Sequence, residues 1–187
     1  MSGKTERKMS GSRRTLVWRV LYLVAAAALY LTDQASKAWA VRELRFGRAR
    51  TVVENVFYFS YAENPGIAFG QLQEGGEFGR WMLAALAALA AVGVLVYFFR
   101  VKGAGDRVLG ACALLLAGIA GNLTDRVRLG HVIDFVEVHL GSFQWPTFNV
   151  ADAAICVGAG LLALDIIFEG KSKKVKGKSE EAEGVAQ

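Results

Sequence analysis

Four long apolar segments constrain the fold of this chain more than any other feature of its sequence. They cover residues 16–41, 81–99, 108–123 and 150–168, and the second of them contains no charged residue. About 20 predominantly apolar residues in a helix cross the hydrocarbon core of a bilayer, which is about 30 Å thick. The segments come close to this length, so the sequence predicts four transmembrane helices that take up most of the chain.

Charged residues are largely separated from these apolar segments. Of the 187 residues, 22 are basic and 17 are acidic, and the formal net charge is +5. A basic chain can bind nucleic acid, but here the basic residues gather in the two tails and in the turn at residues 100–107. Membrane proteins carry their orientation signals at such positions. We therefore expect a membrane protein with no nucleic-acid partner.

The positions of the basic residues also predict the topology. Cytoplasmic loops of membrane proteins carry an excess of Lys and Arg. Both tails and the turn at residues 100–107 are then cytoplasmic, so the chain crosses the membrane several times with both termini in the cytoplasm. Residues 42–80 and 124–149 become two outer loops. The first outer loop has Arg residues of its own, but its Glu residues nearly balance them.

Three regions follow from this pattern. Residues 16–168 form the membrane domain, and the polar tails at residues 1–15 and 169–187 are expected to be disordered because they have little apolar surface to bury. In the first outer loop, residues 51–61 are rich in β-branched and aromatic side chains, and the turn at residues 64–66 follows them. The sequence thus predicts an all-α membrane protein of four transmembrane helices, with a small outer β-sheet between the first two.

Ionisable side chains inside the apolar segments indicate a polar site. A charged residue at the centre of a bilayer costs at least about 2.5–3.5 kcal/mol, so each one needs a partner, a wet cavity or a function. Asp33 and Lys37 are four residues apart and therefore lie on one face of the first helix. We interpret them as a structural ion pair, in contact with a third group, rather than as catalytic residues.

Two further acids lie close to the outer ends of apolar segments. Asp134 interrupts the apolar stretch at residues 132–136, and Asp152 lies at the start of the fourth segment. Each of them alone is typical of a turn aspartate or a helix cap. Asn122, near the end of the third segment, must find hydrogen bonds inside the bundle or on a bound peptide backbone.

Other catalytic classes find less support in the sequence. His131, Asp134 and His139 could bind zinc or iron, but their spacing matches no HExxH pattern and no thiolate cluster accompanies them. Cys112 and Cys156 lie in separate apolar segments, and we interpret them as packing residues. No serine has a GxSxG context. The sequence therefore predicts neither a metal nor another cofactor.

Five motifs taken together resemble the bacterial lipoprotein signal peptidase family, also called signal peptidase II. In chain order they cover residues 33–37, 64–69, 121–126, 132–135 and 148–152. Each motif alone is a weak signal, but their order over four apolar segments is specific. The resemblance extends over roughly residues 16–168 and leaves both tails without a family assignment.

The resemblance implies a membrane aspartyl endopeptidase that removes signal peptides from diacylglyceryl-modified prolipoproteins by cleavage before the lipidated cysteine. Asp134 and Asp152 match the two catalytic aspartates of the family. The positions that match its substrate-binding or site-supporting residues are Asp33, Lys37, Asn64, Gly66, Asn122, Asp125, Arg126, Asn149 and Ala151. The implied partners are lipidated prolipoproteins and membrane lipids, and no cofactor is implied. The implied location is the bacterial inner (cytoplasmic) membrane, with the active site near its outer face.

Two alternatives from other classes stay open at this point. A small proton-coupled membrane transporter would use Asp33, Lys37, Asp134 and Asp152 as a relay. Such a relay needs acids at several depths of the membrane, whereas these four residues lie at one end of their segments. A scaffold or assembly subunit would have no use for paired acids. Cleavage of a lipidated prolipoprotein by the purified protein would separate the three hypotheses.

Overall fold

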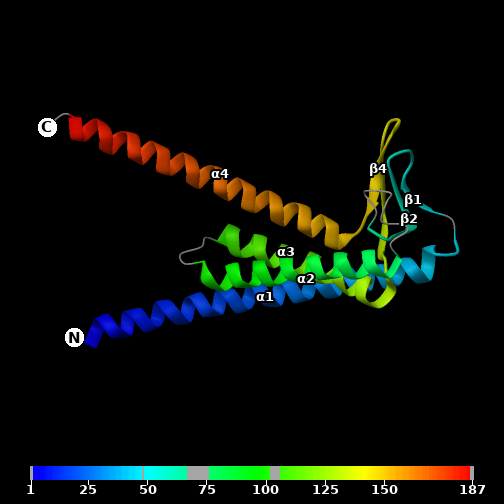
Figure 1. Ribbon diagram of the computed structural model, residues 1–187, viewed down its shortest axis with the longest axis horizontal. Coiled ribbons are helices and arrows are strands. Elements are labelled where there is room, and N and C mark those ends of the chain that lie inside the picture. The colour runs from blue at the N-terminus through cyan, green and yellow to red at the C-terminus, as the bar shows by residue number, and fades with distance from the viewer. Residues whose placement is uncertain (1, 48, 67–75, 102–105, 186–187) are drawn as a thin grey trace.

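A bundle of helices carries a small antiparallel sheet at one end (Figure 1). The computed structural model describes residues 2–47, 49–66, 76–101 and 106–185. Within this part of the chain, four helices are long and apolar enough to cross a membrane, which confirms the predicted fold class. The helices are α1 (Ser2–Leu44), α2 (Gly76–Arg100), α3 (Asp106–Leu129) and α4 (Val150–Val185).

Helix α3 forms the centre of the bundle. It is the most buried of the four membrane-spanning helices, and α1, α2 and α4 all pack on it. Ala113 and Ala117 contact Ala26 of α1. On another side of the helix, a side chain at Gly118 would overlap the carbonyl oxygen of Ala151 in α4. Small residues of α3 therefore let the neighbouring helices approach it closely.

Helix α3 is longer than the apolar pattern predicts. The apolar segment ends near residue 123, whereas the helix continues to Leu129. The helix can continue because the polar side chains of its last turns find partners inside the protein, as described below. Asn122, Asp125 and Arg126 consequently project from one side of a continuous helix, since residues three and four positions apart share a face.

The two outermost helices extend beyond their membrane-spanning segments. Helix α1 starts at Ser2 and α4 ends at Val185, and the disorder expected for residues 1–15 and 169–187 stays a prediction. Lys, Glu and Ala favour helix, and a helix adds residues cooperatively once a stable segment has nucleated it. The borders of the membrane domain at residues 16 and 168, and the cytoplasmic location of the tails, stay predictions.

The sheet contains four antiparallel strands in the order β1-β2-β3-β4. They are β1 (Arg50–Val53), β2 (Phe57–Asn64), β3 (Val132–Leu140) and β4 (Phe143–Phe148). The predicted position between the first two helices holds only for β1 and β2, since β3 and β4 lie between α3 and α4. A lone two-stranded hairpin is marginally stable, so β2 needs the second partner that β3 provides.

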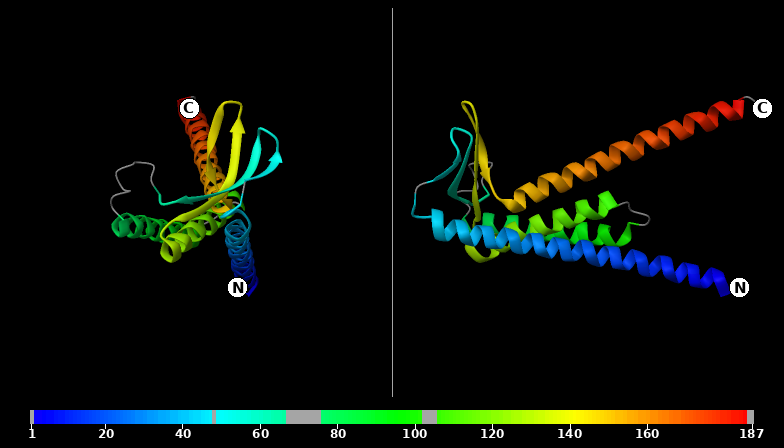
Figure 2. Two further views of the ribbon diagram at one scale, coloured as in Figure 1. Left: turned by 90° about the vertical axis from the view of Figure 1, so that its right-hand side faces the viewer. Right: turned by 180° about the vertical axis from the view of Figure 1, so that it is seen from behind.

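The sheet docks on one end of α1 through strand β3. Ile133 and Phe135 pack against Ala40 and Leu44 of the helix. Successive side chains of a strand point to opposite faces, so Asp134 points away from this apolar cluster. We call this end of the bundle the sheet end, and the opposite end, toward which α1 and α4 diverge in Figures 1 and 2, the tail end.

Candidate active site

Buried polar side chains gather at the sheet end of the bundle. Six polar or charged residues of the described chain are buried, and all of them belong to the motifs identified in the sequence. They are Asp33, Lys37, Asn122, Asp125, Asp134 and Asn149. They come from α1, α3, β3 and the residue that precedes α4, so the fold brings together positions that are far apart in the chain.

Asp134 is almost fully buried, with 2% of its surface exposed. Its Oδ2 atom accepts a hydrogen bond from Asn64 Nδ2 at 2.9 Å, and its Oδ1 atom accepts one from Asn149 Nδ2 at 2.7 Å. Burial raises the pKa of Asp134 to about 6; the charge of Asp152 adds to the rise, while the two amide hydrogen bonds oppose it. Asp134 therefore holds a proton more readily than an ordinary aspartate.

Asp152 lies in the first turn of α4. Its Oδ1 atom accepts a hydrogen bond from Asn122 Nδ2 at 2.7 Å, and its Oδ2 atom accepts one from the Asn149 N–H at 3.2 Å. In return, Asn149 Oδ1 accepts a hydrogen bond from the Asp152 N–H at 2.9 Å, the reciprocal arrangement of a capping box. The capping contacts that start α4 thus also fix the direction of the carboxylate.

Asn149 connects the two acids directly. It is fully buried, its Nδ2 group donates to Asp134, and its backbone N–H donates to Asp152. The Nδ2 group also lies 3.2 Å from Asn122 Oδ1 and 3.2 Å from the Ile133 carbonyl oxygen. Because Asp134 is on a strand and Asp152 is on a helix, this one residue sets their relative position.

Lys37 forms the centre of a second buried cluster beside the two acids. Its Nζ atom lies 2.9 Å from Asp33 Oδ2, 2.8 Å from Asp125 Oδ2 and 3.0 Å from Asn122 Oδ1. An ammonium group has three donors, and three acceptors surround this one. The predicted contact of Asp33 and Lys37 with a third group is confirmed. Asn122 joins the two clusters, since it accepts from Lys37 and donates to Asp152.

The carboxylates around Lys37 also tie the elements of the fold together. Asp33 Oδ1 accepts a hydrogen bond at 2.9 Å from the Ala151 N–H, one of the groups that a helix start leaves without an intrahelical partner. Asp125 Oδ2 accepts one at 3.3 Å from the Ile133 N–H, which joins α3 to β3. A side chain at Gly121 would collide with the Asp33 carboxylate, so the close approach of Asp33 to α3 requires glycine at position 121.

Two residues of this region were missed by the sequence analysis. Gln34 Nε2 lies 3.2 Å from both Asp33 Oδ2 and Asp125 Oδ1. Its place inside the motif at residues 33–37 was the available signal. Arg80 of α2 donates a hydrogen bond to the Arg126 carbonyl oxygen at 2.8 Å and so provides a partner for a backbone carbonyl in the last turn of α3. Nothing in the local sequence around Arg80 indicated that contact.

Arg126 brings a positive charge close to the acids. Its guanidinium interacts electrostatically with Asp152, Asp134 and Asp125. Its Nη1 atom donates to the Asn122 carbonyl oxygen at 3.4 Å. Its Nε atom is buried and has no hydrogen-bond partner within the described part of the chain. The side chain therefore has donor capacity left for another molecule.

An open cavity of about 430 Å³ lies beside Asp134. Its walls include Asn64 at the end of β2, Pro65 directly after it, and Pro146 and Thr147 of β4. Gly66 follows with a φ of 92°, and its N–H donates to Asn64 Oδ1 at 2.9 Å. Residues 67–69 of this motif lie outside the described residues.

The histidines contact glutamates rather than Asp134. His131 Nε2 lies 3.7 Å from Glu63 Oε1, and His139 Nε2 lies 2.6 Å from Glu137 Oε1. Among the described residues, no group of three or more His, Cys, Asp or Glu side chains is arranged to hold a metal ion. The structure therefore does not bring the two histidines and Asp134 together as a ligand set.

Comparison with known proteins decides the family. The family model described as Signal peptidase (SPase) II matches residues 25–168, a range that contains all the site residues named from the sequence. This chain belongs to the signal peptidase II family. Curated relatives named lipoprotein signal peptidase include those of Syntrophotalea carbinolica (44% identity, covering 79% of this chain and 90% of the relative) and Geobacter sulfurreducens (41%, 83% and 96%). The relative from Cellvibrio japonicus is 38% identical, covering 78% of this chain and 85% of its own length.

Solved structures share the fold. Two structures described as a bacterial membrane enzyme solved by the in meso method, at 2.3 Å and 1.9 Å resolution, are similar to this signal peptidase with TM-scores of 0.73 and 0.71. Both are 23% identical to this chain in sequence. The match to the first covers 82% of this chain and 91% of the solved chain. Family membership confirms the predicted class, a transmembrane signal peptidase and hence a protease, and does not support the transporter alternative.

Proposed function

We propose that this signal peptidase is an aspartyl endopeptidase that cleaves diacylglyceryl-modified prolipoproteins before the lipidated cysteine. Relatives that carry the name lipoprotein signal peptidase support the substrate class. The observation that carries the catalytic type is the contact of Asn149 with both Asp134 and Asp152. This contact holds two carboxylates from different elements at one site.

The two carboxylates divide the acid and base roles. Neighbouring carboxylates cannot both ionise cheaply, so they share one proton and titrate as a pair. Asp134 is the better holder of the shared proton, because its burial raises its pKa to about 6. Asp152 accepts hydrogen bonds from Asn122 and Asn149, which fix its direction, and it is the carboxylate left to act as the base.

Cleavage needs water and no covalent intermediate. Asp152 takes a proton from water while the water oxygen attacks the scissile carbonyl carbon, and Asp134 gives its proton to the carbonyl oxygen. The tetrahedral diol then collapses and the C–N bond breaks. The leaving amine receives the proton from Asp152, and a diol hydroxyl returns a proton to Asp134. The pair ends the reaction with one proton, as it began.

The supporting residues divide into three groups. Asn122 and Asn149 position the acids, which matters because a displacement of about 1 Å can cost on the order of 100-fold in rate. Asn64, Gly66 and Arg126 bind the substrate backbone. The cavity wall includes Asn64, and a Cβ atom on Gly66 would lie 3.7 Å from Arg126 Nη2. The residues that hold the helix ends together are Asp33, Lys37, Asp125 and Ala151.

The proposed membrane orientation follows from the distribution of basic residues along the chain. The tail end carries the basic turn at residues 100–107, which favours the cytoplasmic side of the bacterial inner membrane. The sheet end then lies at the outer face. This position suits a substrate whose signal peptide spans the lipid and whose acylated cysteine is held at the outer leaflet.

The direct test uses the full chain, purified and reconstituted in lipid nanodiscs, with three precursors matched in sequence. One precursor is diacylglyceryl-modified, one is unmodified, and one has serine in place of the modified cysteine. We expect a single cut before the cysteine of the modified precursor alone, and no change with EDTA. Equal cleavage of the unmodified precursor would contradict the substrate class. Loss of activity with EDTA that zinc restores would contradict the aspartyl type.

A further inference from the structure

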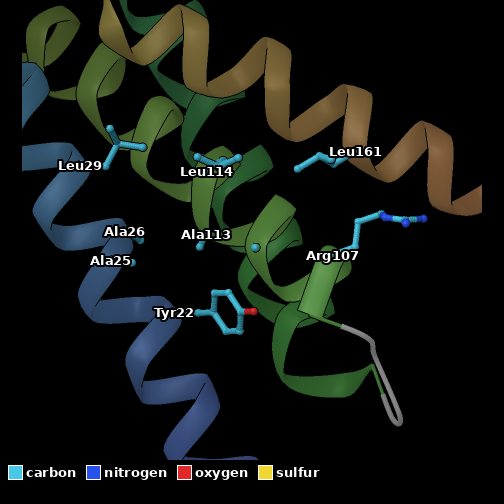
Figure 3. A pocket seen from close by; sticks show the side chains of 9 residues that line it. Tyr22, Ala25, Ala26, Leu29, Arg107, Ala113, Leu114 and Leu161 are labelled. Atoms are coloured by element: carbon cyan, nitrogen blue, oxygen red, sulfur yellow. The ribbon is translucent and has the colours of Figure 1, made fainter.

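An apolar groove runs along the tail-end half of α3 (Figure 3). Its volume is about 310 Å³. Helix α1 forms one wall between Tyr22 and Leu29, α3 forms the floor between Arg107 and Leu114, and Leu161 of α4 completes the lining. No residue that lines the groove belongs to the candidate active site.

The groove results from the divergence of α1 and α4. At the sheet end these helices meet, where Asp33 accepts the hydrogen bond from Ala151. Toward the tail end they separate and leave α3 between them (Figures 1 and 2). Small residues such as Ala25 and Gly110 line the gap and do not fill it. Because the surrounding helices are long and apolar enough to cross a membrane, this apolar gap faces the hydrocarbon, where an acyl chain is a more favourable occupant than water.

The size of the groove identifies the part of a lipid that fits. Tyr22 and Leu29 are seven residues apart, which corresponds to about 10 Å along a helix. A volume of about 310 Å³ over this length is enough for a segment of one hydrocarbon chain. The groove therefore has the length and volume to hold a segment of a single hydrocarbon chain along α3.

The charge at the mouth identifies the class of lipid. Arg107 lies at the tail end of the groove, and about half of its side chain is exposed. Its contact with Asp165 is loose, with 4.0 Å between Nη1 and Oδ1. An exposed guanidinium attracts a phosphate group and repels the basic first region of a signal peptide. We infer that the groove binds one acyl chain of an anionic phospholipid from the leaflet at the tail end, with its phosphate on Arg107.

The test compares two lipids that differ only in head-group charge. The full chain is released from nanodiscs that contain equal amounts of phosphatidylglycerol and phosphatidylcholine with the same acyl chains, and native mass spectrometry counts the lipids it retains. We expect wild type to retain one phosphatidylglycerol in preference to phosphatidylcholine. Because this measurement records lipid binding, its result is independent of the proposed catalytic mechanism.

Charge variants test the role of Arg107. Arg107→Gln should lower the ratio of retained phosphatidylglycerol to phosphatidylcholine by about fivefold, the effect of one basic residue near a membrane surface. Arg107→Lys should keep most of the preference. Asp165→Asn should raise it, because the competing carboxylate is lost. Arg100→Gln is the matched control, since Arg100 ends α2 and does not line the groove.

Steric variants test the groove itself. Ala25→Phe places a large side chain into it and should abolish retention of phosphatidylglycerol, whereas Ala27→Phe, at a neighbouring exposed position of α1, should not. Leu161→Trp fills the same space from α4, so the result does not depend on the folding of one variant. Equal retention of both lipids by wild type, or wild-type retention by both filled variants, would overturn the inference. Displacement of the retained lipid by a signal-peptide probe would assign the groove to substrate and overturn it too.

Discussion

The two ends of the helix bundle are held together in different ways. At the sheet end, buried acids and amides around Lys37 and Asn149 connect α1, α3, α4 and β3 through contacts of 2.7–3.3 Å. At the tail end α1 and α4 diverge (Figure 1). The polar contacts described there are more exposed, such as Arg19 with the Phe99 carbonyl oxygen at 2.8 Å and Arg107 at 4.0 Å from Asp165.

This difference separates a rigid end from a looser one. Burying a charge is unfavourable unless partners surround it, and at the sheet end the partners come from several elements. The buried cluster can therefore form only when that whole end is assembled. Fixed geometry is what catalysis requires, so the rigid end is the end that carries the proposed acids. We expect substitutions at the sheet end to have larger effects than matched substitutions at the tail end.

The largest expected effect is the loss of turnover in variants of the two acids. Asp134→Asn and Asp152→Asn keep the shape of the side chain but remove the shared proton, and a positioned acid or base contributes about 10²–10⁴-fold to the rate. Each variant should stay folded, bind lipidated prolipoprotein and lose at least about 100-fold in kcat. Asp165→Asn, at the tail end, should keep wild-type turnover. Substantial cleavage by either sheet-end variant would contradict the proposed pair.

The next effect is on stability and concerns Lys37. Lys37→Met leaves Asp33 and Asp125 buried without their positive partner, and removal of one partner of a buried ion pair costs about 3–5 kcal/mol. The variant should melt at a much lower temperature in detergent and lose activity with it. Combining Lys37→Met with Asp125→Asn should recover part of the loss, because one buried charge is removed. An unchanged melting temperature in the single variant would show that the cluster does not stabilise the sheet end.

The pH dependence of stability reports on Asp134. Its pKa is raised to about 6 in the folded protein, so its contribution to stability is present below the ordinary aspartate pKa and is lost as the pH rises through about 6. A shift of about two units corresponds to at most about 3 kcal/mol. The melting temperature of wild type should therefore fall relative to that of Asp134→Asn between pH 4 and pH 7. A constant difference over this range would rule out a raised pKa.

A smaller effect is expected from adding one methyl group to the bundle. Gly121→Ala places a Cβ atom against the Asp33 carboxylate, whereas a Cβ atom at Gly93 in α2 meets nothing within 4 Å. Overpacking a filled interior costs about 1–3 kcal/mol. Melting of the two purified variants should show a clear loss for Gly121→Ala and none for Gly93→Ala. Equal stability of the two would mean that the sheet end tolerates expansion as well as the lipid-facing helix does.

The smallest effect belongs to the tail end. Arg19 donates hydrogen bonds to the carbonyl oxygens of Phe99 and Val101, at the end of α2, at 2.8 and 2.7 Å. A cation at a helix C-terminus contributes about 0.3–1 kcal/mol. Arg19→Gln should lower the melting temperature slightly and leave the rate of prolipoprotein cleavage unchanged. A loss as large as that of Lys37→Met would erase the contrast between the two ends.

Much of the fold follows from local sequence patterns. Four apolar segments near the length of a membrane span predict four helices, because long apolar segments are more stable in the hydrocarbon core of a bilayer than in water. The pairing of Asp33 and Lys37 follows from helical spacing alone, since residues four apart share a face. Asp134 and Asp152 were named from the family motifs, and each local pattern by itself indicates only a turn or a cap.

The tertiary structure decided which of these residues meet. Asp125 completes the Lys37 cluster, Asn149 links Asp134 to Asp152, and β3 pairs with β2 of the other outer loop. No local pattern encodes these contacts, because each joins elements that are distant in the chain. Partners for a buried charge or an unpaired strand are selected by the geometry of the whole assembled end, because a buried polar group without a partner is costly.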